Sequence, residues 1–348
     1  MHKIQEGNKL QKMNLQEKVK SFFPSLSVCI YYMMSSLSFC YIYFHKQFFN
    51  VTFYEQNTGG IYYILSLEAI KPNQFRLLIP YLYKAFKTVF FFVPDKAAFF
   101  IIIVVITFIT LVIFYNILNV YFDNKKINQW LTFILFYPML WQFMVLNQIF
   151  DFTDFANFFF IFVGYYCIIK NYNKTLLLFF TLGTFNHDSI GFLIVMYVLF
   201  NIKDIFKQKT IFYTIAMAAI FIIVKKVLET IFASNLGISF RLNYEYNYNQ
   251  FFDMPMHIVV RNVFLTFGGL HLFVLYFFIS GRWKKFNTKY LYITFTLILY
   301  VIIIFLIHTT FEARNYMTAI PFIMILFLLF FTTQKNSFLK PVKEIQRQ

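Results

Sequence analysis

Long apolar windows recur along the chain and are separated by short polar gaps. The windows cover residues 25–44, 97–120, 130–147, 155–170, 175–186, 189–201, 210–233, 257–280, 290–308 and 315–332. A helix of about 20 apolar residues is long enough to cross the hydrocarbon core of a bilayer. The pattern therefore predicts an all-α, polytopic integral membrane protein with about ten membrane-crossing helices, some of them short or broken.

The stretch 175–201 departs from this pattern, because two apolar halves meet at the polar sequence Asn186-His187-Asp188-Ser189. Each half gives about 18 Å of helix, which is too short to cross the core alone. A single continuous helix would place His187 and Asp188 in the middle of the membrane. Two short helices that dip into a water-filled funnel fit better, since irregular backbone at membrane depth is tolerated only where it lines such a cavity.

The segment 45–95 is a long interruption that mixes basic and apolar residues. Arg76 and Lys87 belong to a stretch in which basic groups recur along an apolar helix. This is typical of a helix that lies in the membrane interface, with its Lys stems along the apolar surface. A Gly-Gly pair and Pro72 interrupt the segment, so we expect two short interfacial helices joined by a turn.

Composition supports the membrane class and excludes several others. The 348 residues are 59% hydrophobic and only 13% charged, whereas a soluble chain is about one quarter charged. Counts of 10 Gly, 8 Pro and 3 Cys also exclude collagen-like, disordered and disulfide-rich chains.

The net charge of +16 is distributed unevenly between the polar gaps. Basic clusters lie at 3–20, 125–126, 170–174, 203–209, 282–289 and 335–347. The gaps between them carry few or no Lys or Arg, apart from 45–95, which is long enough to translocate regardless of its charge. Basic residues stay on the cytoplasmic side, so the alternation predicts a multi-pass protein of the inner (plasma) membrane with both termini cytoplasmic. The charge is then a topology signal, with membrane lipids rather than nucleic acid as partners.

This topology divides the chain into three parts. Residues 1–24 are expected to form a cytoplasmic N-terminal tail, residues 25–332 the transmembrane domain, and residues 333–348 a cytoplasmic C-terminal tail. The transmembrane domain has outward-facing loops at 45–95 and 234–256.

Several ionisable side chains fall on the predicted outward side. A charge at membrane depth is energetically costly, so each of them is expected to have a structural or functional role. They are Glu55, Glu68, Arg76, Asp151, Asp154, His187, Asp188, Arg241, Glu245, Asp253, Glu312 and Arg314. Lys225 and Lys226 lie within the apolar window 210–233, in the third of it that is nearest the outer side.

Each of these groups also has a purely structural interpretation. Asp151 or Asp154 would cap a helix that starts near residue 155. The Asn186–Ser189 sequence would form a cap and turn, and Glu312 and Arg314 a local ion pair. Lys225 and Lys226 would extend toward the interface. These alternatives stay open at the level of the sequence.

A membrane cavity with carboxylates and cations on one side suits a lipid-linked phosphosugar. A carboxylate deprotonates an acceptor hydroxyl as general base, and Arg or Lys neutralises a leaving phosphate. Tyrosines at 244, 246 and 248 offer aromatic faces and hydroxyls to sugars. No metal-ligand spacing is present. A pair of carboxylates would suit a hard divalent ion such as Mg²⁺ or Mn²⁺, which is the one cofactor left open.

Four fragments carry a resemblance to a known superfamily. They are QFRLLIPYL at 74–82, NQIFDFTDFANFFFIF at 147–162, TLGTFNHDSIGFLI at 181–194 and EARNYMTAIPFI at 312–323. In this order they resemble bacterial multi-pass glycosyltransferases of the GT-C superfamily that use polyprenyl-phosphate sugars. The chain departs from those relatives at two points. The third fragment has Asn-His-Asp where they have Asn-Arg/Lys-Glu, and the first outward loop has Glu55 and Glu68 where they have an Asp.

The resemblance implies a GT-C-like fold and a direct, inverting transfer of a sugar to a glycan, lipid or protein acceptor on the outer face. Glu55 is the expected base, with Asp151 as its substitute. The expected substrate-binding residues are Arg76, Asp154, His187, Asp188, Lys225, Lys226, Arg241 and Arg314.

Three other functions fit the same chain. One is a polymerase or ligase of lipid-linked polysaccharides, although the loop at 234–256 has only Arg241 where such enzymes are rich in Arg. The second is a transporter or flippase for a lipid-linked or anionic substrate, although the chain lacks the repeated halves typical of many transporters. The third is a membrane scaffold.

Overall fold

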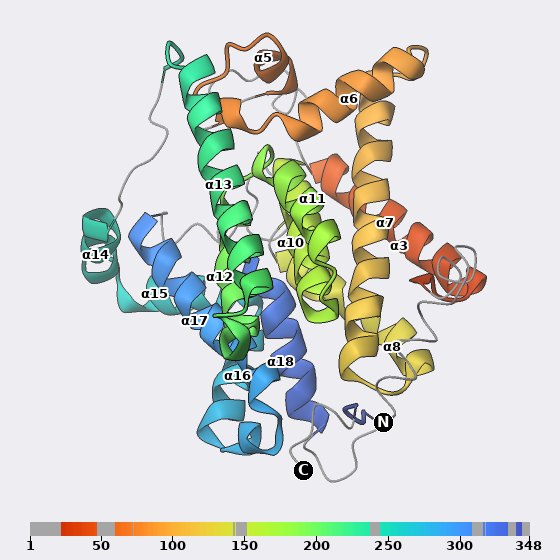
Figure 1. Ribbon diagram of the computed structural model, residues 1–348. Coiled ribbons are helices and arrows are strands. Elements are labelled where there is room, and N and C mark those ends of the chain that lie inside the picture. The colour runs from red at the N-terminus through yellow and green to blue at the C-terminus, as the bar shows by residue number, and fades with distance from the viewer. Residues whose placement is uncertain are drawn as a thin grey trace.

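The computed structural model describes residues 22–46, 60–71, 73–141, 143, 152–236, 244–307, 316, 318–332 and 339–342. Within these ranges every regular element is a helix and no β-strand is present, which confirms the all-α prediction. Figure 1 shows long helices that run between two ends of the molecule, with shorter helices across the upper end.

The chain contains both α-helices and 3₁₀ helices (η). The first half contains α3 (Leu26–Lys46), α5 (Ile61–Leu65), η1 (Asn73–Phe75), α6 (Leu78–Val89), α7 (Asp95–Tyr121), α8 (Lys125–Leu131), η2 (Thr132–Leu135), α9 (Phe136–Leu140) and α10 (Phe152–Lys170). The second half contains α11 (Asn173–Thr184), η4 (Asp188–Gly191), α12 (Phe192–Phe200), η5 (Ile202–Asp204), α13 (Gln208–Ile231), α14 (Tyr244–Asp253), α15 (Met256–Phe267), α16 (Leu270–Ile279), η6 (Arg282–Lys285), α17 (Thr288–Ile307) and α18 (Ile320–Thr332).

Among the residues that the structure describes, three helices are long and apolar enough to cross a membrane: α3, α7 and α13. α7 has 27 residues and α13 has 24, which correspond to about 40 Å and about 36 Å of helix. Only 17% of the apolar window of α13 is buried inside the protein. The exposed apolar side chains of α13 would face water in a soluble protein, so a lipid environment around this helix accounts for them. They include Ile211, Phe212, Ile215, Ile222, Ile223, Val227 and Ile231.

One end of the molecule, which we call the basic end, holds both described ends of the chain. The Asn116 Nδ2 atom, near the end of α7, donates a hydrogen bond to the Phe22 carbonyl at 2.7 Å. The Val342 amide donates to the Tyr121 carbonyl at 2.9 Å. The helix starts and turns that carry Lys125, Lys203 and Lys284 lie at this lower end in Figure 1.

The stretch 175–201 forms two short helices, α11 and α12, joined by the turn at 185–187 and η4, as the sequence predicts. The Asn173 Nδ2 atom at the start of α11 donates to the Tyr197 hydroxyl near the end of α12 at 3.2 Å. This bond shows that the two helices are antiparallel. The basic residues that precede α11 and follow α12 therefore lie at the same end, as the charge alternation requires.

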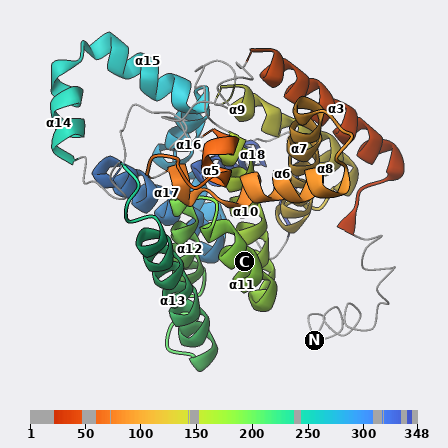
Figure 2. The same cartoon turned by 90° about the horizontal axis from the view of Figure 1, so that it is seen from above.

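The opposite end, which we call the site end, is covered by the segment 60–89, here named the cover. Figures 1 and 2 show α5 and α6 lying across this end of the bundle. The Lys71 amide donates to the Leu236 carbonyl at 2.8 Å, and the Asn235 Nδ2 atom donates to the Ala69 carbonyl at 2.9 Å. These bonds attach the cover to the chain that follows α13.

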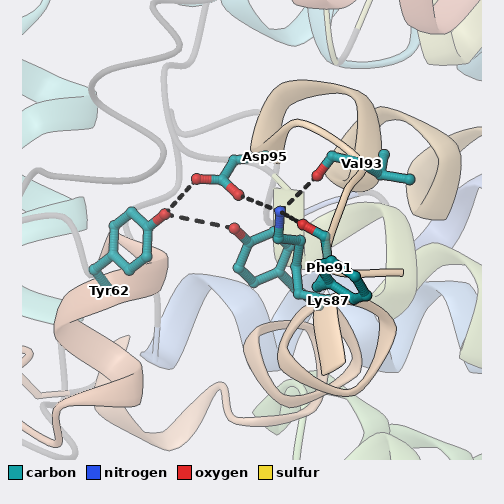
Figure 3. Close-up of polar contacts among 6 residues, drawn as sticks. Tyr62, Lys87, Phe91, Val93 and Asp95 are labelled. Carbon is teal, nitrogen blue, oxygen red and sulfur yellow. Dashed lines mark hydrogen bonds and ion pairs between the residues drawn. The ribbon is translucent and has the colours of Figure 1, made fainter. Parts of the chain in front are cut away.

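A polar latch fixes the cover to the start of α7 (Figure 3). The Lys87 ammonium lies 3.0 Å from Asp95 Oδ1 and donates to the Val93 carbonyl at 2.5 Å. The Tyr62 hydroxyl donates to Asp95 Oδ2 at 2.7 Å. Lys87 is therefore held in an ion pair rather than extending freely toward lipid headgroups, which corrects that part of the prediction.

The predicted window 257–280 is divided by Gly268 and Gly269. Their φ values of +56° and +81° are left-handed, which glycine adopts readily and which ends α15 before α16 begins. The window 130–147 is likewise divided into α8, η2 and α9 over its described part.

Candidate functional site

The centre of the site is Asp154, in the first turn of α10. The helix begins at Phe152, so Asp154 is its third residue and not the cap that precedes it. The side chain of Asp154 is only 4% exposed. Its position in the first turn stabilises the negative charge, because the free N–H groups and the helix dipole favour an anion there. Asp151, the alternative cap, lies outside the described residues.

His187 faces Asp154 from the turn between α11 and α12. Its Nε2 atom lies 3.7 Å from Asp154 Oδ1, and its Nδ1 atom accepts the Ser189 amide at 3.1 Å. His187 therefore caps η4, as the structural interpretation of this turn predicts, and also pairs with the carboxylate. Because Nδ1 accepts a hydrogen bond, the imidazole proton is on Nε2, directed at Asp154.

Neutral polar side chains join this turn to α10. The Asn186 Nδ2 atom donates to the Thr153 carbonyl at 2.8 Å, and the Ser189 hydroxyl donates to Asn157 Oδ1 at 2.8 Å. Thr153, Asn157 and Asn186 are all buried. The turn is therefore held against the start of α10 by polar contacts rather than by apolar packing alone.

Asp188 and Lys225 form the more exposed side of the site. The Lys225 ammonium pairs with Asp188 Oδ1, and the two side chains are 16% and 44% exposed. Lys225 lies six residues before the end of α13, and this contact directs it into the site rather than toward the interface.

Arg76 enters from the cover, between η1 and α6. Its Nη1 atom donates to Thr153 Oγ1 at 3.1 Å. Its neighbours Phe75 and Leu77 pack in one apolar cluster with Val224 on α13, the residue before Lys225. The cover thus brings Arg76 to the same region as Lys225. Arg76 precedes α6 instead of lying on its face, which corrects the predicted basic stripe.

The structure therefore brings together five of the predicted site residues from four separate segments. They are Arg76, Asp154, His187, Asp188 and Lys225. Asp188 is the most exposed of the paired side chains at 44%, whereas Lys225, His187 and Asp154 are 16%, 12% and 4% exposed. Such an arrangement binds an anionic group at its cations and hydrogen-bond donors at its buried oxygens.

The other predicted residues divide into two groups. Lys226 is exposed on α13, and Glu68 is exposed on the cover. Glu55, Asp151, Arg241 and Arg314 lie outside the described residues, together with Glu312.

The tyrosines proposed as sugar contacts belong to α14, which lies away from the site in both views (Figures 1 and 2). Tyr248 is exposed and packs against Phe252, with ring centroids 4.7 Å apart. In the structure α14 is thus an outlying helix, and its Glu245 and Asp253 are exposed there too.

Among the described residues, no group of three or more His, Cys, Asp and Glu is placed to hold a metal ion. The nearest carboxylates of the site, Asp154 and Asp188, bind His187 and Lys225 instead.

Two members of the site, Thr153 and Asn157, were not among the residues expected from the sequence. Both are neutral residues within the first turns of a helix, where the same residue types commonly serve as caps. Their periodicity carries one signal, because positions 153, 154 and 157 share one face of α10.

No protein-family model, no curated protein and no solved structure matches this chain.

Proposed function

We propose that the chain is a GT-C-like glycosyltransferase with about ten membrane crossings. It moves a sugar from a polyprenyl-phosphate donor to a glycan, lipid or protein acceptor on the outer face of the inner membrane. Both termini lie in the cytoplasm, and the site end faces outward.

The observation that carries this proposal is the joining of Arg76 and Lys225 with the buried Asp154–His187 pair at one end of long apolar helices. A lipid phosphate needs cationic donors at the border of the membrane, and Arg provides two parallel N–H groups for it. A sugar needs polar groups beyond the phosphate, shielded from water.

At the anomeric carbon the reaction forms one bond and breaks one. The acceptor hydroxyl attacks the anomeric carbon, and the bond from that carbon to the phosphate oxygen breaks. The polyprenyl phosphate leaves with the bonding electrons, while the hydroxyl proton passes to a carboxylate, for which Glu55 and Asp151 are the candidates. Arg76 and Lys225, with Arg314, stabilise the charge that develops on the leaving phosphate.

Donor turnover by the purified protein in nanodiscs tests this function. A panel of radiolabelled polyprenyl-phosphate hexoses is supplied with a mixture of acceptor glycans, and release of polyprenyl phosphate is measured. We expect turnover of at least one donor, and a loss of about tenfold or more in Arg76→Ala, because a hydrogen bond to a charged group contributes about 1.5–3 kcal/mol. Arg76→Lys should keep part of the activity.

The matched control is Lys126→Ala, which removes a cation from the basic end and should leave turnover unchanged. Movement of intact lipid-linked sugar across the bilayer, with no release of polyprenyl phosphate from any donor, would contradict the proposal and identify a carrier.

A further inference from the structure

Two buried oxygen atoms in the site have no hydrogen-bond partner among the described residues. They are Asp154 Oδ2 and Asn186 Oδ1. The side chain of Asn186 is oriented by its Nδ2 atom, which donates to the carbonyl of Thr153, the residue directly before Asp154. The two oxygens therefore belong to adjacent parts of one polar cluster.

Such oxygens are costly to bury. An unsatisfied buried acceptor loses about 1–3 kcal/mol of solvation, and a charged one loses more. The other carboxylate oxygen of Asp154 lies 3.7 Å from His187 Nε2, which is longer than an ordinary hydrogen bond. Asp154 is thus a buried carboxylate that the nearby His187 imidazole satisfies only weakly.

The described part of the chain contains five more such atoms, on Ser36, Asn128, Asn173, His271 and Thr318. None of these five groups is a carboxylate, and Ser36, Asn128, Asn173 and His271 lie on four different helices. Asp154 and Asn186 differ from them in that both belong to the polar cluster around Thr153, to which Asn186 and Arg76 donate hydrogen bonds.

Both oxygens are acceptors, so the group that satisfies them must donate hydrogen bonds. A phosphate does not, because its oxygens are acceptors as well. A hard metal ion would require six or more oxygen ligands, and the described residues provide no group of three or more potential ligands there. Water and hydroxyl groups both donate, and in a sugar site the hydroxyl groups of the sugar take the place of water.

We propose that Asp154 Oδ2 and Asn186 Oδ1 form a subsite for the hydroxyl groups of the sugar. The phosphate of the same donor binds Arg76 and Lys225 nearer the surface. His187 is a positioning residue, because the Ser189 amide fixes its Nδ1 atom while its Nε2 atom faces the carboxylate of Asp154 at 3.7 Å. This inference rests on the proposed function, since it divides one lipid-linked sugar between the two parts of the site.

The subsite makes a prediction that phosphate binding alone does not. Removal of either hydrogen-bond acceptor, Asp154 Oδ2 or Asn186 Oδ1, should weaken binding of the glycosylated lipid. Binding of the bare lipid phosphate should stay unchanged. Asp154→Asn exchanges one acceptor oxygen for a donor, and Asn186→Leu removes an acceptor at similar volume.

The test is native mass spectrometry of the full chain titrated with undecaprenyl phosphate and with its glucose, galactose and mannose conjugates. The measured quantity is the ratio of the dissociation constant of the bare lipid to that of each conjugate. In the wild type we expect this ratio to exceed one for at least one sugar. Asp154→Asn and Asn186→Leu should lower the ratio about tenfold for that sugar. The matched control is Asn173→Leu, at the opposite end of α11, which should not change it.

Two outcomes overturn the inference, and they are distinguishable. If the wild type prefers a conjugate and both variants keep that preference, the subsite is wrong while the proposed function stands. If the wild type binds the bare lipid as tightly as it binds every conjugate, the proposed function fails together with the subsite. Bare-lipid binding by each variant shows that it is folded.

Discussion

Lys225 and Lys226 are neighbours on α13 with different surroundings. Lys225 is mostly buried and pairs with Asp188, whereas Lys226 is exposed. We predict that Lys225→Met lowers donor turnover about tenfold or more, because it removes a charge that we propose contacts the leaving phosphate. Lys226→Met removes the same charge one position away and should change turnover less than twofold.

The melting temperatures of the two lysine variants separate chemistry from folding. Asp188 is 44% exposed, so loss of its partner should cost less than about 1 kcal/mol of stability. Equal loss of turnover in both variants would show that Lys225 has no specific role. A large drop in melting temperature in Lys225→Met alone would show that its role is structural.

At the scale of single residues, charge was the informative signal. Arg76, Asp154, His187, Asp188 and Lys225 could be identified because an ionisable group in an apolar context needs a partner. Their pairing could not be identified, since it depends on how α10, the turn after α11, α13 and the cover pack together. Neutral Thr153 and Asn157 carry no such signal, because a buried hydrogen bond and a helix cap use the same residue types.

At the scale of elements, close contact between α10 and α12 depends on Gly164. A Cβ atom at this position would overlap the side chain of Leu193, which is buried. We predict that Gly164→Ala lowers the melting temperature, because overpacking costs about 1–3 kcal/mol and outweighs the gain in helix propensity of about 1 kcal/mol.

The double-mutant cycle gives this packing prediction its control. In a Leu193→Ala background the space is open, so Gly164→Ala should raise the melting temperature instead. The same sign of change in both backgrounds would show that the contact between α10 and α12 is looser than described.

The sequence indicated the two short helices α11 and α12 because a polar group in mid-membrane and the charge alternation excluded one continuous helix. It did not indicate the break at Gly268 and Gly269. Glycines in an apolar window are common in membrane helices, and only the left-handed φ values show that these end a helix. The position of α14 away from the site could not be predicted either, because periodicity predicts a helix but not its neighbours.

At the scale of the whole molecule, the two ends differ in charge and in the elements that they hold. The basic end carries the described chain ends, and the site end carries the cover. Cysteine labelling in intact cells tests the proposed orientation, in a chain whose Cys29, Cys40 and Cys167 are replaced by Ser.

We predict that Glu68→Cys, on the exposed part of the cover, reacts with a membrane-impermeant maleimide in intact cells. Lys284→Cys, in η6 at the basic end, should react only after the cells are permeabilised. If only Lys284→Cys reacts in intact cells, the orientation is the reverse of the one proposed, and the site end faces the cytoplasm.

The central claim is that one lipid-linked phosphosugar binds across the site end. A cryo-EM structure of the full chain in a nanodisc, with a polyprenyl-phosphate sugar that it turns over, tests this most directly. We predict density for the phosphate in contact with Arg76 and Lys225, and density for the sugar beside Asp154 and Asn186. Lipid phosphate bound only at the basic end, or a sugar held on α14 with the Asp154–His187 pair unchanged, would contradict the account.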